Sequence, residues 1–298
     1  MLWPIGDGER ADDRPGGRTG EVSPADVYGA DHRPPRVGRP WVLVNMIASV
    51  DGAATDPSGR SGGLGGPADR RVFSAIRAVA DIVLAGASTV RTERYGPART
   101  PPSLQEARLA RGQAARPRVA VVTRSLALDL ELPLFREATD EDRPIVITTT
   151  AGLDRLRSSA GSTADRDLAM VAEIVIAGEE SVDWATALAA LRTGARAGVV
   201  LVEGGPTTNA QLVAADLVDE LCLTVSPQLA GAGGRRIVSG PDTAPPRPMA
   251  LNRVLVEDDH LFLRYLRLRE VDRAGVAADA SPLVEAEPPS RPRRRPPE

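Results

Sequence analysis

Short apolar runs alternate with segments of helical periodicity between Trp41 and Ala215, and this alternation constrains the fold most. The runs are four to eight residues long and rich in Val and Ile, as buried strands are; they span 41–48, 81–85, 118–123, 144–149, 174–177 and 198–202. Helical spacing occurs over 67–79, 183–192 and 207–215. This α/β pattern predicts a mostly parallel central sheet with flanking helices.

The pattern changes after residue 217. Residues 218–226, 249–256 and 261–268 have the composition of strands, and no helical segment separates them. A tight acidic turn at 257–259 joins the last two, which predicts a C-terminal antiparallel hairpin on one edge of the sheet. Residues 96–116 form a long connection, for which we predict a helix within 104–116.

The two ends of the chain differ from its centre. Residues 1–38 hold clusters of Pro, Gly, Asp and Arg without an apolar run, and residues 272–298 are rich in Pro and Arg. Such segments bury too little apolar surface to offset the entropy of ordering, so we predict that both are disordered. Residues 39–271 are enough for one domain.

Composition excludes several classes of protein. The formal net charge is −3, which gives no basic field for nucleic acid, and no apolar run is long enough for a membrane helix. The N-terminus lacks the pattern of a signal peptide, so we expect a cytoplasmic protein. One Cys, two His and no Lys among 298 residues argue against a disulfide, a metal site and a lysine-based mechanism.

The segment from Gly86 to Gly96 follows a predicted buried strand directly. Small and hydroxyl residues at that point, before a helix, present backbone N–H groups to an anion, with Thr89 in the first turn. Ordinary helix capping by Ser88 or Thr89 explains the same residues.

A second strand ends in Glu203-Gly204-Gly205, and Pro206 then opens a helix. Two glycines let the backbone approach a pyrophosphate closely, and a helix N-terminus is electropositive. Glu203 is a candidate ligand for substrate N–H groups. The alternative is a structural turn in which Glu203 pairs with an Arg.

Two further segments give weaker signals. Thr123 and Arg124 follow a strand, as in sites that bind the 2′-phosphate of NADP, although a solvated charge explains Arg124 equally. Residues 49–67 are Gly-rich. Their match to a dinucleotide fingerprint at 63–68 follows a loop instead of a strand, so we expect a loop beside the site.

Three motifs occur in a fixed order: RPWVLVNMIASVDGAAT at 39–55, DIVLAGASTVRTERYGP at 81–97 and VVLVEGGPTTNAQLVAADLVDELCLTVSPQLAG at 199–231. Together they resemble the reductase domain of bacterial riboflavin biosynthesis, over about 39–271. The resemblance implies a dihydrofolate-reductase-like fold, NADPH as cofactor and a homodimer. It implies reduction of the ribosyl group of 5-amino-6-(5-phosphoribosylamino)uracil to ribityl. It also implies a cis peptide between Gly204 and Gly205.

The resemblance carries over to individual residues. The cofactor contacts that it implies, together with those expected from the strand ends, are Ile47, Gly86, Ser88, Thr89, Glu93, Thr123, Arg124, Gly204, Gly205, Pro206, Thr207, Thr208 and Asn209. The substrate positions are Asn45, Ser61, Arg77 and Glu203, with Arg77 expected on the phosphate. Family members commonly have Lys near Asn45 and at Ala53, and a bulky S-x-W-I segment where this chain has Ser61-Gly62-Gly63-Leu64. These departures concern the substrate side.

Two carboxylates are candidates for the chemistry. Glu203 and Asp51 could orient the pyrimidine or relay a proton, although Asp51 could equally cap a turn. A dihydrofolate or pteridine reductase is the alternative enzyme, and a non-catalytic NADP-binding protein is a third hypothesis.

Overall fold

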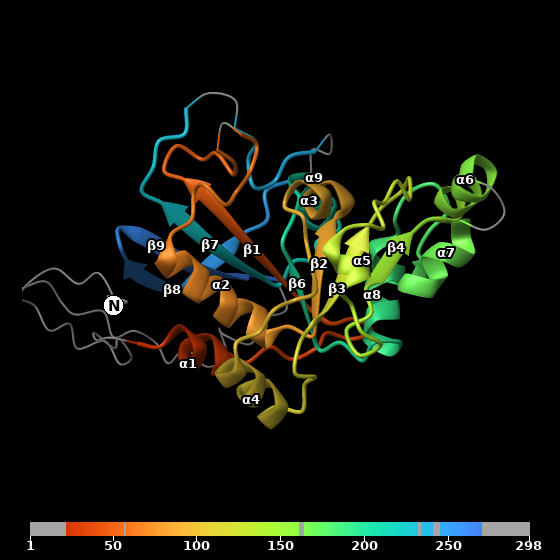
Figure 1. The fold of residues 1–298 in the computed structure, drawn as a ribbon. Helices are drawn as coiled ribbons and strands as arrows, with labels where there is room; N and C mark the ends of the chain where they lie inside the picture. The colour runs from red at the N-terminus through yellow and green to blue at the C-terminus, as the bar shows by residue number, and fades with distance from the viewer. Residues whose placement is uncertain (1–21, 57, 161–163, 232–233, 241–244, 270–298) are drawn as a thin grey trace, which may run out of the picture. The chain divides into compact units, whose positions relative to one another are not determined.

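A computed structural model of the chain describes residues 22–56, 58–160, 164–231, 234–240 and 245–269 (Figure 1). Residues 1–267 form one unit and residues 268–298 a second. The predicted disordered tail 272–298, the predicted domain end at residue 271 and the first part of the predicted N-terminal segment lie outside the described residues.

The strands form one sheet in the order β5-β4-β3-β2-β6-β1-β7-β9-β8. Neighbours from β5 to β7 are parallel, whereas β9 pairs antiparallel with both β7 and β8. The strands are β1 (Trp41–Ser49), β2 (Ile82–Gly86), β3 (Arg118–Val122), β4 (Ile145–Thr148), β5 (Glu173–Ile176), β6 (Val199–Val202), β7 (Glu220–Ser226), β8 (Met249–Glu257) and β9 (His260–Arg267). The predicted α/β class and the C-terminal hairpin are confirmed.

The helices cover the sheet, with α2 lying across one face (Figure 1). They are α1 (Pro24–Gly29), α2 (Pro67–Val79), α3 (Ala87–Thr92), α4 (Pro102–Ala110), α5 (Pro133–Arg136), α6 (Thr150–Ala160), α7 (Ala164–Val171), α8 (Trp184–Thr193) and α9 (Pro206–Ala214). The predicted helix in 104–116 corresponds to α4. Residues 150–160 and 164–171, for which no element was predicted, form α6 and α7; their large apolar side chains are Leu153 and Leu156 in α6 and Leu168, Met170 and Val171 in α7, which are short runs for a helical period.

Alternate strand residues pack into two cores. Leu43 of β1 joins Val72 and Ile76 of α2 on one face. Val42 and Val44 of β1 pack on the other face with residues of α8 and α9. Because successive strand residues point to opposite faces, Asn45 and Ile47 fall on the α2 face, at the carboxyl end of β1.

The turn between β8 and β9 is formed by Asp258 and Asp259, with φ of 49° and 59°. Two consecutive left-handed residues are the geometry of a tight hairpin turn, and Asp is among the residues that tolerate it. The acidic turn predicted at 257–259 is therefore confirmed.

Part of the predicted N-terminal disordered segment is folded, so that prediction is wrong for residues 22–38. Ser23 caps α1, and Tyr28 is buried with 1% of its surface exposed. Arg33 donates two hydrogen bonds to Glu220 of β7, at 2.9 and 2.8 Å. The apolar surface of this segment is small, but a buried carboxylate 187 residues away fixes it, and composition cannot reveal such a partner.

Glu220 is the centre of a buried ionic network. Its side chain has no exposed surface and also accepts hydrogen bonds from Arg264, at 2.7 and 3.2 Å, and from Trp41 Nε1, at 3.1 Å. Burial opposes ionisation, yet the hydrogen bonds and charges of Arg264 and Arg33 hold the pKa of Glu220 below its ordinary value. The network ties residues 22–39 to β7 and β9.

Candidate functional site

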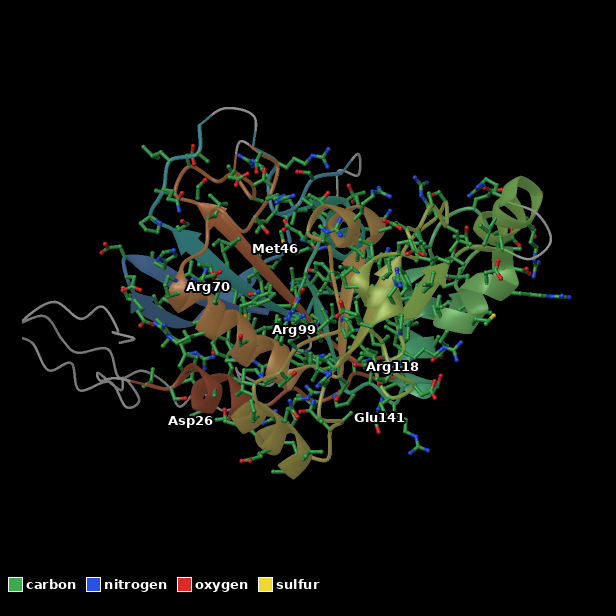
Figure 2. The ribbon with its side chains drawn as sticks, in the orientation of Figure 1. Asp26, Met46, Arg70, Arg99, Arg118 and Glu141 are labelled. Carbon is green, nitrogen blue, oxygen red and sulfur yellow. The ribbon has the colours of Figure 1, made fainter. Side chains whose placement is uncertain are left out.

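A cavity of about 870 Å³ opens where the parallel strands β1, β2 and β6 end. This is the edge at which open α/β sheets bind ligands. Its walls are completed by residues 54–56 and 59–65 before α2, the first turns of α2, α3, the start of α9, and Ala230, Gly234 and Arg235. Figure 2 shows Met46 on β1 and Arg70 on α2, both lining residues. Nine of the predicted site residues line it: Asn45, Ile47, Ser61, Ser88, Thr89, Glu93, Glu203, Gly205 and Pro206.

Glu203 is held by two side chains. Arg77 donates from Nε to Oε1 and from Nη2 to Oε2, both at 2.7 Å, and Tyr95 Oη donates to Oε2 at 2.6 Å. The Arg77 guanidinium stacks on the ring of Phe73, 4.3 Å from its centre. Arg77, expected on the substrate phosphate, is therefore committed to Glu203 and is not among the cavity-lining residues.

The pKa shifts in this cluster have clear causes. Burial disfavours the charged guanidinium of Arg77, but the Glu203 carboxylate outweighs burial and raises the pKa of Arg77. Burial and the negative charge of Glu203 raise the pKa of Tyr95 well above its ordinary value. Tyr95 thus stays protonated as a donor, and Glu203 Oε1, which among the described residues accepts only from Arg77 Nε, keeps a lone pair for a ligand N–H group.

The segments predicted to bind the cofactor meet closely beside the cavity. Gly86 N donates to Gly204 O at 2.8 Å, and the Gly204–Gly205 peptide is cis, as predicted. A Cβ on Gly205 would lie 2.9 Å from Thr89 Oγ1, and one on Gly86 would lie 3.1 Å from Thr208 Oγ1. A side chain at either position would therefore force a threonine hydroxyl to move, and glycine lets β2, α3 and α9 approach one another without that shift.

These residues fit the phosphates of a dinucleotide. No side chain caps the N-terminus of α9, whose first-turn N–H groups remain available, and Gly205 brings bare backbone to the cavity wall. Thr89 adds a hydroxyl on the same wall. Such a cradle of glycine backbone, amide N–H groups and a hydroxyl suits an anionic pyrophosphate.

Ser61, predicted to contact the substrate, and Glu93, predicted to contact the cofactor, are hydrogen-bonded to each other. Glu93 Oε1 accepts from Ser61 N at 3.1 Å and from Ser61 Oγ at 3.2 Å. Glu93 thus anchors the loop 54–65 against α3, and both residues line the cavity.

Asp51 has a different place from the one predicted for a catalytic carboxylate. It does not line the cavity; it accepts hydrogen bonds from Ser49 Oγ and from the backbone N–H groups of Ala230 and Gly231. These bonds, that from Ser49 first, lower the pKa of Asp51. Asp51 therefore holds the backbone at Ala230 and Gly231. This structural role resembles the turn-capping alternative given in the sequence analysis.

Several predicted cofactor residues lie outside the cavity lining. Thr123 is buried and its Oγ1 accepts from Leu126 N at 3.0 Å, whereas Arg124 is exposed. Asn209 faces a separate cavity of about 140 Å³, and its Nδ2 donates to Ile237 O at 2.8 Å. Thr207 is exposed on α9. The 2′-phosphate role of Thr123 and Arg124 stays a prediction.

The sequence reasoning missed Tyr95, Phe73 and Asp69, all of which line the cavity. Tyr95 lies inside the predicted segment 86–96, so its neighbourhood was indicated but its partner was not. Asp69 lies in the first turn of α2, and Thr224 of β7 donates a hydrogen bond to it. Burial raises the pKa of Asp69, although the Thr224 bond and the charges of His260 and Arg70 oppose the shift.

The described part of the chain contains no helix of the length and apolarity that crossing a bilayer would need. No group of three or more His, Cys, Asp or Glu side chains within it is arranged to hold a metal ion.

Comparison with known proteins gives consistent relatives. The RibD C-terminal domain family matches residues 40–258. The 2,5-diamino-6-ribosylamino-4(3H)-pyrimidinone 5′-phosphate reductase of Archaeoglobus fulgidus is 28% identical over 238 residues, 80% of this chain and 94% of that protein. The protein of the same name from Methanothermobacter thermautotrophicus is 30% identical, over 68% of this chain and 85% of its own length.

Solved structures agree on the fold. A pyrimidine reductase-like protein from Corynebacterium diphtheriae superposes with a TM-score of 0.72 at 25% identity, covering 84% of this chain and all of that one. RibD of Acinetobacter baumannii superposes with a TM-score of 0.61 at 22% identity, covering 78% of this chain and 58% of that one. The latter likeness concerns the fold alone.

Proposed function

Because the chain belongs to the RibD C-terminal domain family of reductases, we propose that it uses NADPH to reduce the ribosyl group of a 6-(5-phosphoribosylamino)pyrimidine to ribityl. We propose 5-amino-6-(5-phosphoribosylamino)uracil as this substrate. The observation that carries the proposal is the pairing of two walls in one cavity. Gly205 and Thr89, which would bind the cofactor phosphates, line the same cavity as the Glu203 carboxylate.

NADPH would supply a hydride to C1′ of the ribosyl group, and this chain would position both reactants. Gly205, the first-turn N–H groups of α9 and the Thr89 hydroxyl would hold the cofactor phosphates, and the Gly86 N–H bond to Gly204 O would keep these segments together. Ile47 lines the cavity from the end of β1, on the face that carries Asn45. Arg124 would lie toward the 2′-phosphate.

Glu203 would orient the pyrimidine and would not donate a proton. Arg77 donates to both carboxylate oxygens, and the remaining lone pair of Oε1 would accept a ring or exocyclic N–H group of the substrate. Tyr95 and Arg77 fix the carboxylate so that little orientational freedom is lost on binding. Asn45 is a second polar group of the cavity wall.

The test is NADPH oxidation, followed by absorbance, with three substrates side by side. These are 5-amino-6-(5-phosphoribosylamino)uracil, its 2,5-diamino-4-pyrimidinone counterpart and dihydrofolate. We expect turnover with a ribosylaminopyrimidine and a large loss of kcat/KM in Glu203→Gln, with NADPH affinity kept. Turnover of dihydrofolate alone would assign the chain to the pteridine reductases. No turnover with any of the three would leave an NADP-binding protein.

A further inference from the structure

The charged side chains that line the large cavity differ in whether they have hydrogen-bond or ion-pair partners within the protein. Four carboxylates and two guanidinium groups line it: Asp56, Asp69, Glu93, Glu203, Arg70 and Arg235. Glu203 is bound by Arg77 and Tyr95, and Glu93 by Ser61. Asp56 accepts hydrogen bonds from residues of its own turn, Ser58 and Arg60. These three carboxylates therefore have their partners.

The side chains of Arg70 and Arg235 have no hydrogen-bond or ion-pair partner among the described residues. Within the described part of the chain, neither Arg70 nor Arg235 donates a side-chain hydrogen bond or forms an ion pair, although the charge of Arg70 acts on neighbouring Asp69. Both are exposed at the cavity. A guanidinium that faces a ligand cavity and makes no hydrogen bond or ion pair within the protein is free to bind an anion.

The backbone under both residues is fixed. Arg70 lies in the first turns of α2, where its N–H donates to Gly66 O at 3.1 Å. Arg235 O accepts from Ala54 N at 2.7 Å, and Asp51 holds the same loop at Ala230 and Gly231. Gly234 packs so closely on Ala53 that a side chain there would overlap it. The two guanidinium groups thus come from two separate segments of the cavity lining that are each anchored.

We propose that Arg70 and Arg235 bind the 5′-phosphate of the substrate. This inference rests on the proposed function, because a phosphate monoester is what distinguishes that substrate from a plain ribosylamine. It moves the phosphate contact away from Arg77, whose guanidinium Glu203 occupies. Two planar donors can each bind a phosphate dianion bidentately, with Glu203 left to the pyrimidine.

The chain supplies a matched control beside each residue. Arg71 is the next residue on α2, but it pairs with Glu257 and does not line the cavity. Arg236 follows Arg235 and does not line the cavity either. Arg71→Ala and Arg236→Ala therefore change the net charge as Arg70→Ala and Arg235→Ala do, without removing a cavity guanidinium.

The first experiment compares KM for the 5′-phosphorylated substrate and for its phosphate-free analogue. Arg70→Ala and Arg235→Ala should each raise KM for the phosphorylated substrate about tenfold or more, the scale of a charged hydrogen bond. KM for the analogue, kcat and the NADPH dissociation constant should stay as in the wild type. An equal effect on both substrates, or weaker NADPH binding in these variants, would overturn the proposal.

A second experiment does not depend on turnover. Ribose 5-phosphate is titrated calorimetrically into the wild type, the double variant Arg70→Ala/Arg235→Ala and the double variant Arg71→Ala/Arg236→Ala. Binding should be lost in the first double variant and kept in the second. Equal binding in all three proteins would refute the phosphate site, whereas binding without turnover of any ribosylaminopyrimidine would refute only the proposed function.

Discussion

Substitution of Gly205 by Ala tests how the cofactor wall is built. The Cβ of an alanine at this position would lie 2.9 Å from Thr89 Oγ1, whereas ordinary van der Waals contact begins at 3.4 Å. The Thr89 hydroxyl must therefore move by about 0.5 Å, the difference between 3.4 and 2.9 Å, either by rotating or by a separation of the two segments. Since both would contact the cofactor phosphates, the displacement acts directly on the cradle.

We expect Gly205→Ala to weaken NADPH binding at least tenfold, which corresponds to about 1.4 kcal/mol. The loss should depend on Thr89, because its hydroxyl is the atom that the new methyl group meets. In Gly205→Ala/Thr89→Ala the clash is absent. The double variant should therefore lose less than the sum of the two single variants, with a coupling of about 1 kcal/mol.

Fluorescence titration of NADPH into the four proteins of this cycle gives the measurement. Gly62→Ala is the control, because Gly62 also lines the cavity but no atom lies within 4 Å of its Cβ position. It should bind NADPH as the wild type does. Additive losses in the cycle, or wild-type affinity in Gly205→Ala, would refute the steric argument.

Four further predictions concern other parts of the molecule. Glu220→Gln should lower the free energy of unfolding by about 3–5 kcal/mol in denaturant titrations, because it leaves the buried guanidinium groups of Arg33 and Arg264 uncompensated. Since the folded pKa of Glu220 lies below its ordinary 4.5, the wild type should lose this stability as the pH falls through that folded pKa. Asp69→Asn should stabilise the fold at neutral pH, because the raised pKa means that ionisation of Asp69 costs stability as the pH rises above 3.8. Arg124→Ala should cost about 1.5–3 kcal/mol of NADPH binding and leave NADH binding unchanged. The predicted homodimer should dissociate into monomers in Leu223→Glu, as measured by light scattering. Leu223 lies among half-buried apolar side chains on the face of β7 and β9 opposite α2, where a second copy would pack.

Each of these has a contrary result. A pH-independent difference between Glu220→Gln and the wild type would contradict the ionic argument, as would unchanged stability. Asp69→Asn should give no gain at pH 3; a gain there would point to packing. Equal losses of NADPH and NADH binding in Arg124→Ala would remove it from the 2′-phosphate. A wild type that is already monomeric would contradict the dimer.

The strands were predictable to within one or two residues, because a buried parallel strand is a continuous apolar run that ends at Gly, Pro or a polar residue. Helix α2 was predicted with its observed bounds, since Pro67 and the spacing of Val72, Ile76 and Val79 are local signals. Helices α6 and α7 hold only two and three large apolar side chains, in runs too short to give a comparable periodicity.

The site was predictable where function depends on backbone, and less so where it depends on pairing. The Gly204–Gly205 turn is visible in sequence because glycine itself is the signal. Arg77 was expected on the substrate phosphate, yet it binds Glu203, 126 residues away. No local pattern reveals that choice of partner, and the same holds for the Tyr95 hydroxyl.

The ionic network around Glu220 also bears on how the protein should be cut for expression. Arg33 precedes the family match at 40–258, and Arg264 follows it. A fragment trimmed to those limits would lose both guanidinium groups and with them strand β9, and it would leave a buried carboxylate beside an unpaired sheet edge. An expression fragment should therefore extend at least from Val22 through Arg267.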